Sequence, residues 1–232
     1  MRIIPAGDEA LVVEFGREID EVINTMVQNL SVKIERAGLK GIRETLPTYR
    51  SLMIFYDSRI TGFRRLEHEI RKIRISKERT EESERKVIEI PCCYEEEYAP
   101  DLRGMEKITG ISSKEIVRLH TSREYRIYML GFLPGFVYLG GLDERIAAPR
   151  LETPRKEIPA GAVGIGGNQT GIYPVASPGG WRLIGSTPLK LYDPDREEPA
   201  LLKAGDYLHF TTISRKEYQL IKSDLKEGSL YG

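Results

Sequence analysis

The stretch from Gly131 to Trp181 constrains this chain most, because glycine or proline recurs in it every few residues. Glycine permits positive φ or close backbone approach, and proline fixes φ. A flexible linker would be poor in aromatic residues, yet this stretch is rich in them. The pattern predicts shaped loops whose rings either wall a pocket or fill a β-barrel. The five large rings belong to Phe132, Phe136, Tyr138, Tyr173 and Trp181.

The charge balance bears on the class of partner. The chain has 35 Lys and Arg against 35 Asp and Glu, so it lacks the basic excess typical of nucleic-acid binding. No apolar run reaches the length of a membrane span, and the N-terminal residues lack a signal core. We expect a cytoplasmic protein with no nucleic-acid or membrane partner. A charged fraction of 30% favours a thermophilic source.

The first part of the chain alternates strand and helix patterns. Their order, β-α-β-β-α-β, predicts a ferredoxin-like α+β domain. The segment Ser76 to Lys86 has no apolar residue and predicts a boundary between domains 1–85 and 86–232. The predicted elements are the strand Ala10–Phe15, the helix Asp20–Ala37, the strands Ile42–Leu46 and Ser51–Tyr56, the helix Phe63–Ile73 and the strand Val87–Ile90.

The second part is predicted to be mainly β. Ser112 with Glu115, and Ser214 with Glu217, have the spacing of capping boxes that open two short helices. Many short strands between glycine and proline turns indicate a barrel or a sandwich. The predicted strands are Tyr125–Leu130, Ala162–Ile165, Ile172–Val175, Arg182–Ile184, Leu189–Tyr192 and Asp206–Thr212.

A glycine-rich turn from Gly164 to Gly171 lacks the GK[ST] ending of a phosphate loop. Two interpretations remain: an anion-binding nest of backbone N–H groups, or a β-turn with glycines at positive φ. Gln169 and Thr170 add side-chain donors and acceptors at the turn.

Among the histidines, His120 is the candidate acid–base residue, because it ends a predicted helix just before Gly131. The alternative is an ordinary histidine at a helix C-terminus. Arg155 is a candidate for binding developing negative charge, or else a surface ion-pair partner. The adjacent Cys92 and Cys93 predict buried thiols, and no ligand spacing for a metal is present.

Longer motifs resemble the allophanate hydrolase subunit 1 family over essentially the whole chain. Family members have a cyclophilin-like barrel, so the resemblance implies an α+β protein with a ferredoxin-like and a cyclophilin-like domain. The matching segments are Tyr94, Pro100–Leu102, His120, Gly131–Phe132, Pro134–Phe136, Tyr138–Asp143, Pro149–Arg150, Pro159–Gly161, Gly164–Ile165, Gln169–Pro174, Ser177–Trp181 and Pro188–Leu189. One segment departs: the family has Y-G-G-E-x-G-P-D-L, where this chain places Glu95, Glu96 and Ala99 at the glycine positions.

The resemblance implies the B component of an ATP-dependent enzyme that opens 5-oxoproline to glutamate. Such a component works with a homologous C component and an A component, with ATP as co-substrate, and is inactive alone. The alternatives are an inhibitor that binds a sensor histidine kinase, as KipI does, and the carboxyltransferase half of a urea-carboxylase-like enzyme. The site predicted for this chain has His120 and Arg155 as catalytic residues and, as substrate-binding residues, Phe132, Pro134, Phe136, Tyr138, Gly166, Gln169, Thr170, Tyr173, Gly180 and Trp181.

Overall fold

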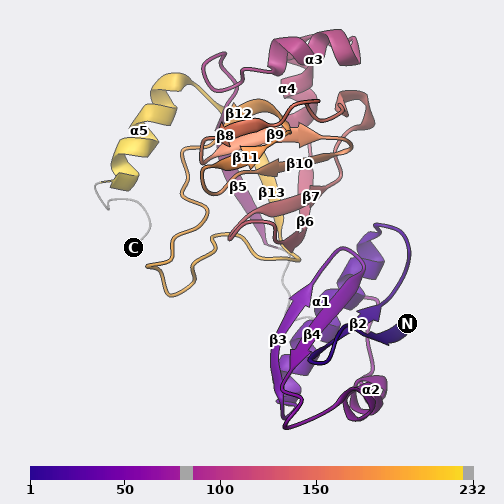
Figure 1. Cartoon of the computed structure of the whole chain (residues 1–232). Coiled ribbons are helices and arrows are strands. Elements are labelled where there is room, and N and C mark those ends of the chain that lie inside the picture. The colour runs from indigo at the N-terminus through magenta and orange to yellow at the C-terminus, as the bar shows by residue number, and fades with distance from the viewer. Residues whose placement is uncertain (79–85, 227–232) are drawn as a thin grey trace. The chain divides into compact units, whose positions relative to one another are not determined.

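The computed structural model describes residues 1–78 and 86–226. The chain divides into two compact units, Met1–Arg85 and Lys86–Gly232 (Figure 1). Most of the polar segment from Ser76 to Lys86, on which the predicted boundary rests, lies outside the described residues.

The first unit is a four-stranded antiparallel sheet with two helices. The order of strands in the sheet is β1-β2-β4-β3. One hydrophobic core joins the sheet to both helices, with Leu11, Ile54, Leu30 and Ile70 fully buried. The elements are β1 (Arg2–Pro5), β2 (Ala10–Glu14), α1 (Glu21–Ala37), β3 (Ile42–Pro47), β4 (Ser51–Tyr56) and α2 (Phe63–Lys72).

The element order of this unit differs from the predicted β-α-β-β-α-β. The predicted last strand, Val87–Ile90, belongs to the barrel of the second unit, while β1 supplies the fourth strand here. Alternating apolar residues identify a strand but carry no information on the sheet it joins. The predicted helix end is confirmed: Gly38 closes α1 in the left-handed conformation at φ 54°.

The second unit is built around a closed barrel of seven strands in the order β10-β7-β6-β13-β5-β12-β9. Strands β5 and β13 pair in parallel, and β8 and β11 form a separate two-stranded ribbon. The elements are β5 (Val87–Cys93), α3 (Leu102–Thr109), α4 (Ser113–Thr121), β6 (Glu124–Leu130), β7 (Val137–Gly140), the 3-10 helix η1 (Glu144–Ile146), β8 (Arg155–Ile158), β9 (Ala162–Gly166), β10 (Gln169–Ile172), β11 (Ser177–Gly179), β12 (Arg182–Ser186), β13 (Tyr207–Ile213) and α5 (Arg215–Lys226).

Most predicted strands of this unit are present, with two corrections. Leu189–Tyr192 is not a strand; of its residues, Tyr192 forms an isolated bridge to Ala200. The strand predicted at Ile172–Val175 is shifted: β10 covers Gln169–Ile172 and shares only Ile172 with the prediction. Pro174 lacks the backbone N–H that a continuing ladder needs. Helix α3, the barrel strand β7 and the ribbon of β8 and β11 were not predicted.

One glutamate that replaces a family glycine, Glu95, holds helix α5 together with its neighbour Glu97. The Glu95 carboxylate accepts a hydrogen bond from the Arg215 N–H at 2.8 Å, at the first residue of α5. Glu97 pairs with the Arg215 guanidinium at 3.1 Å. Ser214 and Glu217 close the predicted capping box reciprocally at the same helix end. The departure at Glu95 therefore coincides with a contact between the loop and α5, whereas Glu96 pairs with Arg103 of α3 at 3.0 Å.

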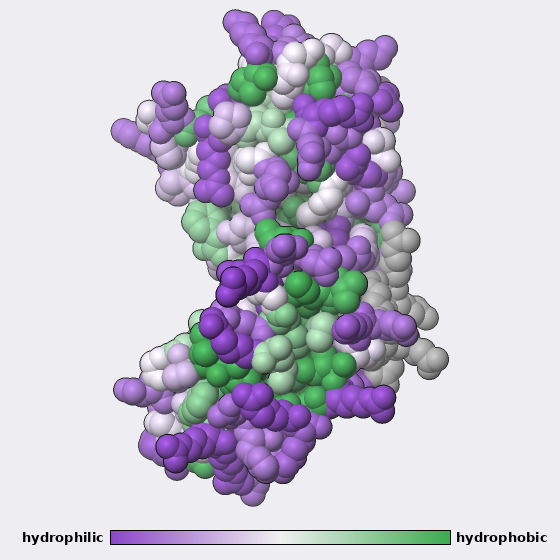
Figure 2. All heavy atoms as spheres, turned by 90° about the vertical axis from the view of Figure 1, so that its right-hand side faces the viewer, coloured by the Kyte–Doolittle hydropathy of each residue, from purple (hydrophilic) through white to green (hydrophobic). Residues whose placement is uncertain are grey.

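Hydrophobic side chains also reach the surface. In Figure 2 they gather on the lower body, which is the first unit. Large exposed hydrophobic residues of this unit include Ile19, Val22 and Ile60. Ile19 and Val22 lie at the N-terminal end of α1, whereas Ile60 lies against Gly41 beyond the other end, so these three residues do not form one patch.

We expect Glu95→Ala to lower the free energy of unfolding of the second unit by about 1 kcal/mol, because the N-terminus of α5 loses a carboxylate acceptor. Urea unfolding followed by the emission of Trp181, the one tryptophan of the chain, measures this loss. The control is Glu197→Ala, which removes an exposed carboxylate. Equal free energies of unfolding for the two variants would contradict the assignment.

Candidate functional site

The five aromatic residues of the glycine- and proline-rich stretch meet in one cluster around Phe136. The Phe136 ring lies edge-to-face against Phe132 at 5.8 Å and against Tyr138 at 5.0 Å. Tyr173 and Trp181 approach it in the same way, at 5.3 and 5.7 Å between ring centroids. The quadrupoles of aromatic rings favour this geometry. Strands β7 and β10 and the start of β12 thus bring together residues that are far apart in the sequence.

Burial divides this aromatic cluster into two parts. Phe136 and Tyr173 are each 2% exposed and Trp181 is 5% exposed, so these three rings form a small core of their own. Phe132 is 68% exposed, and Tyr138 is half-buried. The surface that a ligand can reach is therefore made by Phe132 and Tyr138 rather than by all five rings.

Glycines make room for Trp181. A Cβ atom at Gly166 would lie 2.6 Å from the indole nitrogen, and one at Gly171 would lie 3.0 Å from its six-membered ring. A Cβ at Gly164 would lie 3.1 Å from the Trp181 Cβ. These distances are shorter than ordinary van der Waals contact, so strands β9 and β10 need glycine at these positions. Gly166, predicted to bind substrate, lies beneath the indole in this structure.

The segment that carries Phe132 has an unusual backbone. Phe132 has φ 70°, and among the described residues no other non-glycine residue has positive φ. A bulky residue in this region costs about 1 kcal/mol or more. Pro134, also predicted to bind substrate, is exposed in the same turn between β6 and β7. The turn therefore holds an exposed aromatic side chain in a strained conformation.

His120 and Thr170 come together inside the barrel. The Thr170 hydroxyl donates to the Gly164 carbonyl at 3.0 Å, so its oxygen accepts from His120 Nε2–H at 2.9 Å. His120 Nδ1 then accepts from the Tyr94 hydroxyl at 2.8 Å. This chain of hydrogen bonds fixes the Nε2–H tautomer of a neutral imidazole. It links helix α4 to strands β9 and β10, which carry the glycines under Trp181.

The environment of His120 disfavours its charged form. The residue is fully buried, and its ring lies 4.5 Å from that of Phe210 between centroids. Burial lowers the pKa of His120 to about 3. At neutral pH the imidazole is a hydrogen-bonding group within the barrel, and the acid–base role stays a prediction.

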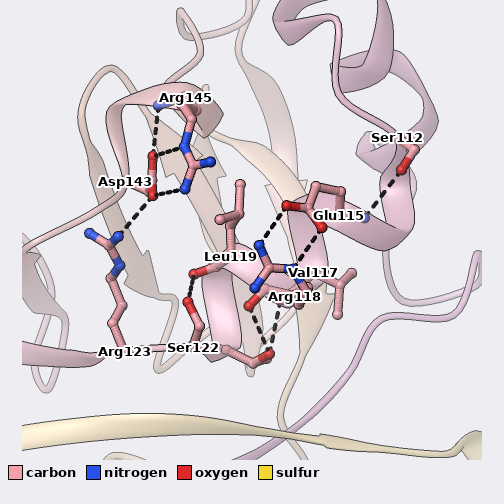
Figure 3. A network of polar contacts seen from close by, with 10 residues as sticks. Ser112, Glu115, Val117, Arg118, Leu119, Ser122, Arg123, Asp143 and Arg145 are labelled. Atoms are coloured by element: carbon pink, nitrogen blue, oxygen red, sulfur yellow. Dashed lines mark hydrogen bonds and ion pairs between the residues drawn. The ribbon is translucent and has the colours of Figure 1, made fainter.

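A polar network anchors the segment that follows helix α4 (Figure 3). The Asp143 carboxylate accepts hydrogen bonds from the backbone N–H and the guanidinium of Arg145. It also accepts one from the Arg123 guanidinium at 2.8 Å. Hydrogen bonds from Arg145 hold the pKa of Asp143 well below its usual range. Arg123 also donates to the Gly141 carbonyl at 2.8 Å. The network joins the residues after α4 to the chain after β7.

Arg155, the second predicted catalytic residue, lies at an ion pair. Its guanidinium binds Asp101 at 2.7 Å, and the other oxygen of Asp101 accepts from the Leu183 N–H at 2.6 Å. Asp101 lies directly before helix α3 and belongs to the Pro100–Leu102 motif, but sequence reasoning did not single it out as a functional residue. Its carboxylate compensates the charge of Arg155.

The glycine-rich turn is a β-hairpin between β9 and β10. Gly166 pairs with Gln169, and Gly167 has φ 68° between them. The Gly167 N–H donates to the Ala148 carbonyl at 2.8 Å. One donor of the proposed anion nest is therefore occupied, which favours the β-turn interpretation. Gly180, another predicted residue, precedes Trp181 and accepts a hydrogen bond from Leu151 N–H.

Residues 1–78 and 86–226 lack two features that would indicate other classes of function. They contain no group of three or more His, Cys, Asp or Glu side chains placed to hold a metal ion. None of their helices is long and apolar enough to cross a membrane. Cys92 and Cys93 are buried free thiols, as predicted.

Comparisons with known proteins assign the chain to a family. Residues 1–202 match the family described as carboxyltransferase domain, subdomain C and D, and the chain belongs to this family. A curated relative, the 5-oxoprolinase B component of Bacillus subtilis, is 42% identical over 94% of this chain and 95% of its own length. The predicted resemblance is thereby confirmed.

Solved structures support the fold. The crystal structure of TTHA0988 has a TM-score of 0.80 and 35% sequence identity, covering 89% of this chain and 40% of its own. This chain thus spans about two fifths of that protein. The urea carboxylase of Kluyveromyces lactis has a TM-score of 0.78 at 23% identity, covering 98% of this chain and 23% of its own, and shows a shared fold.

The burial of His120 predicts a pH dependence. Because the folded-state pKa is about 3 against an ordinary 6.5, the unfolded chain binds a proton first as pH falls. The stabilisation by neutral His120 is complete above pH 6.5 and is lost by about 1.4 kcal/mol per pH unit below it. The wild type should therefore lose more of its free energy of unfolding than His120→Gln as pH falls from 6.5 to 4.5. Urea unfolding of both proteins at several pH values measures this. His68→Gln, which removes an exposed histidine, is the control; parallel profiles for wild type and His120→Gln would contradict the prediction.

The contact between Gly166 and Trp181 predicts a second effect. Gly166→Ala should lower the free energy of unfolding by about 1–3 kcal/mol and shift the Trp181 emission, because the new methyl overlaps the indole. Gly104→Ala is the matched control, since that helical glycine has open space around it. Unchanged stability and emission in Gly166→Ala would show that Trp181 does not need this glycine.

Proposed function

We propose that this chain is the B component of an ATP-dependent 5-oxoprolinase, which opens the lactam ring of 5-oxoproline to glutamate. The observation that carries the proposal is the match to the 5-oxoprolinase B component of Bacillus subtilis, at 42% identity over nearly the whole of both chains. The aromatic cluster around Phe136, with arginines beside it, supports a site for a small cyclic anion.

The complex, rather than this chain alone, is proposed to carry out the reaction. The partners are the homologous C component and the A component, and ATP is the co-substrate. Phosphorylation of the ring carbonyl oxygen would let water attack the carbon, break the C–N bond and release phosphate. A cytoplasmic location and a thermophilic source are parts of the same proposal.

Residue roles follow from the positions described. Phe132 and Tyr138 are proposed to contact substrate, because their rings reach solvent at the aromatic cluster. Arg155 is proposed to stabilise the negative charge that develops during the reaction. His120 is proposed to influence the site indirectly, through its hydrogen bond to Thr170. We also propose that the first unit is ferredoxin-like, with β1 in the place of the last strand, and that the closed barrel is cyclophilin-like.

The carboxyltransferase half of a urea-carboxylase-like enzyme is the second candidate. The Kluyveromyces lactis urea carboxylase shares the fold over 98% of this chain, but at 23% identity the likeness carries fold alone. Inhibition of a sensor histidine kinase stays a prediction without support from these relatives.

Reconstitution tests the proposed function. The purified chain should show no ATP-dependent release of glutamate from 5-oxoproline, and adding the C and A components should produce it. Urea and ATP with a biotin carboxylase serve as the control for the second candidate. Full turnover of 5-oxoproline by this chain without partners would contradict its dependence on the other components. Turnover of urea but not of 5-oxoproline would favour the second candidate.

A further inference from the structure

Arg150 is a cation without a compensating carboxylate at the aromatic cluster. Its guanidinium carbon lies 5.8 Å from the centroid of the Trp181 ring. Within residues 1–78 and 86–226, no hydrogen bond or ion pair is found for its side chain, which is exposed. Arg155 differs, because Asp101 binds its guanidinium at 2.7 Å. Of these two arginines, Arg150 has the guanidinium that is available to a ligand.

The backbone on both sides of Arg150 is fixed. The preceding Pro149 carbonyl accepts from Arg182 Nε at 2.8 Å, and the following Leu151 N–H donates to the Gly180 carbonyl at 2.7 Å. Gly180 and Arg182 are the neighbours of Trp181 in the chain. Arg150 is therefore held beside the indole by hydrogen bonds that its own side chain does not make.

The positive charge of Arg150 reaches the aromatic hydroxyls. Burial raises the pKa of Tyr138 and of Tyr173, and the charge of Arg150 opposes this rise in both. Glu152, the nearest carboxylate along the chain, is exposed and has no bond to Arg150 in the described residues. The exposed edge of the aromatic cluster therefore combines a positive charge with the apolar surface of Phe132 and Tyr138.

We infer that Arg150 binds the carboxylate of a small cyclic ligand whose ring lies against Phe132 and Tyr138. A guanidinium pairs with a carboxylate through two parallel hydrogen bonds, and its position over an indole leaves its edge free for them. The inference rests on the proposed function, since 5-oxoproline is a lactam that carries one carboxylate. It goes further by assigning the recognition of that group to Arg150 rather than to Arg155.

Two ligands separate recognition of the carboxylate from recognition of the lactam. 5-Oxoproline and 2-pyrrolidinone share the ring and differ in the carboxylate. Binding to the full chain is followed by the Trp181 emission and by calorimetry, for wild type, Arg150→Gln and Arg150→Lys. Lys156→Gln removes a charge from an exposed side chain of β8 and is the matched control.

The wild-type chain should bind 5-oxoproline more tightly than 2-pyrrolidinone. Arg150→Gln should weaken binding of 5-oxoproline about tenfold and leave 2-pyrrolidinone unchanged, as expected for loss of charge-assisted hydrogen bonds. Arg150→Lys should retain part of the affinity, and Lys156→Gln all of it. Unchanged affinity in Arg150→Gln, equal losses for both ligands, or no preference of wild type for 5-oxoproline would each overturn the inference.

Turnover by the reconstituted complex separates this inference from the proposed function. If the wild-type complex releases glutamate and Arg150→Gln keeps the same KM for 5-oxoproline, the role of Arg150 is wrong and the function stands. If the wild-type complex is inactive while the full chain prefers 5-oxoproline through Arg150, the site stands and the proposed function fails.

Discussion

The buried hydrogen bond between His120 and Thr170 is the interaction on which the candidate site depends. A polar pair inside a barrel is stabilising only when every donor and acceptor is satisfied. Tyr94 on one side and the Gly164 carbonyl on the other complete the chain. Because the Gly164 carbonyl can only accept, the direction of the whole chain is set. Helix α4, strand β9 and strand β10 are thereby held in one arrangement.

Trp181 rests on the outer side of the same strands. Its indole lies against Gly164, Gly166 and Gly171, where any side chain would overlap it. The hydrogen-bonded chain inside and the indole outside thus share strands β9 and β10. A change in the interior at Thr170 is expected to move the surface on which Arg150 lies, although the two residues are not in contact.

Spacing in the sequence revealed part of this arrangement. The rings between Gly131 and Trp181 were predicted to lie around shaped loops, and the structure brings them together. The burial of His120 was not predictable, because a position at a helix end does not reveal which way the side chain points. The strand that begins at Val87 was predicted, but the sheet that it joins was not. Its partner β13 lies far along the chain, so the local sequence carries no signal of the pairing. Strands β1, β7, β8 and β11 are too short for periodicity to detect.

The parallel pairing of β5 with β13 has a consequence for how the chain is made. Val87 pairs with Tyr207 and Cys93 with Ile213, so the first and last barrel strands are neighbours. During synthesis the barrel stays open until the ribosome has released the segment around Ile213. The first unit depends on no such late partner and is free to fold earlier. A chain that stops before β13 would therefore have a folded first unit and an open barrel. The unpaired edges of β5 and β6 would then be prone to aggregation.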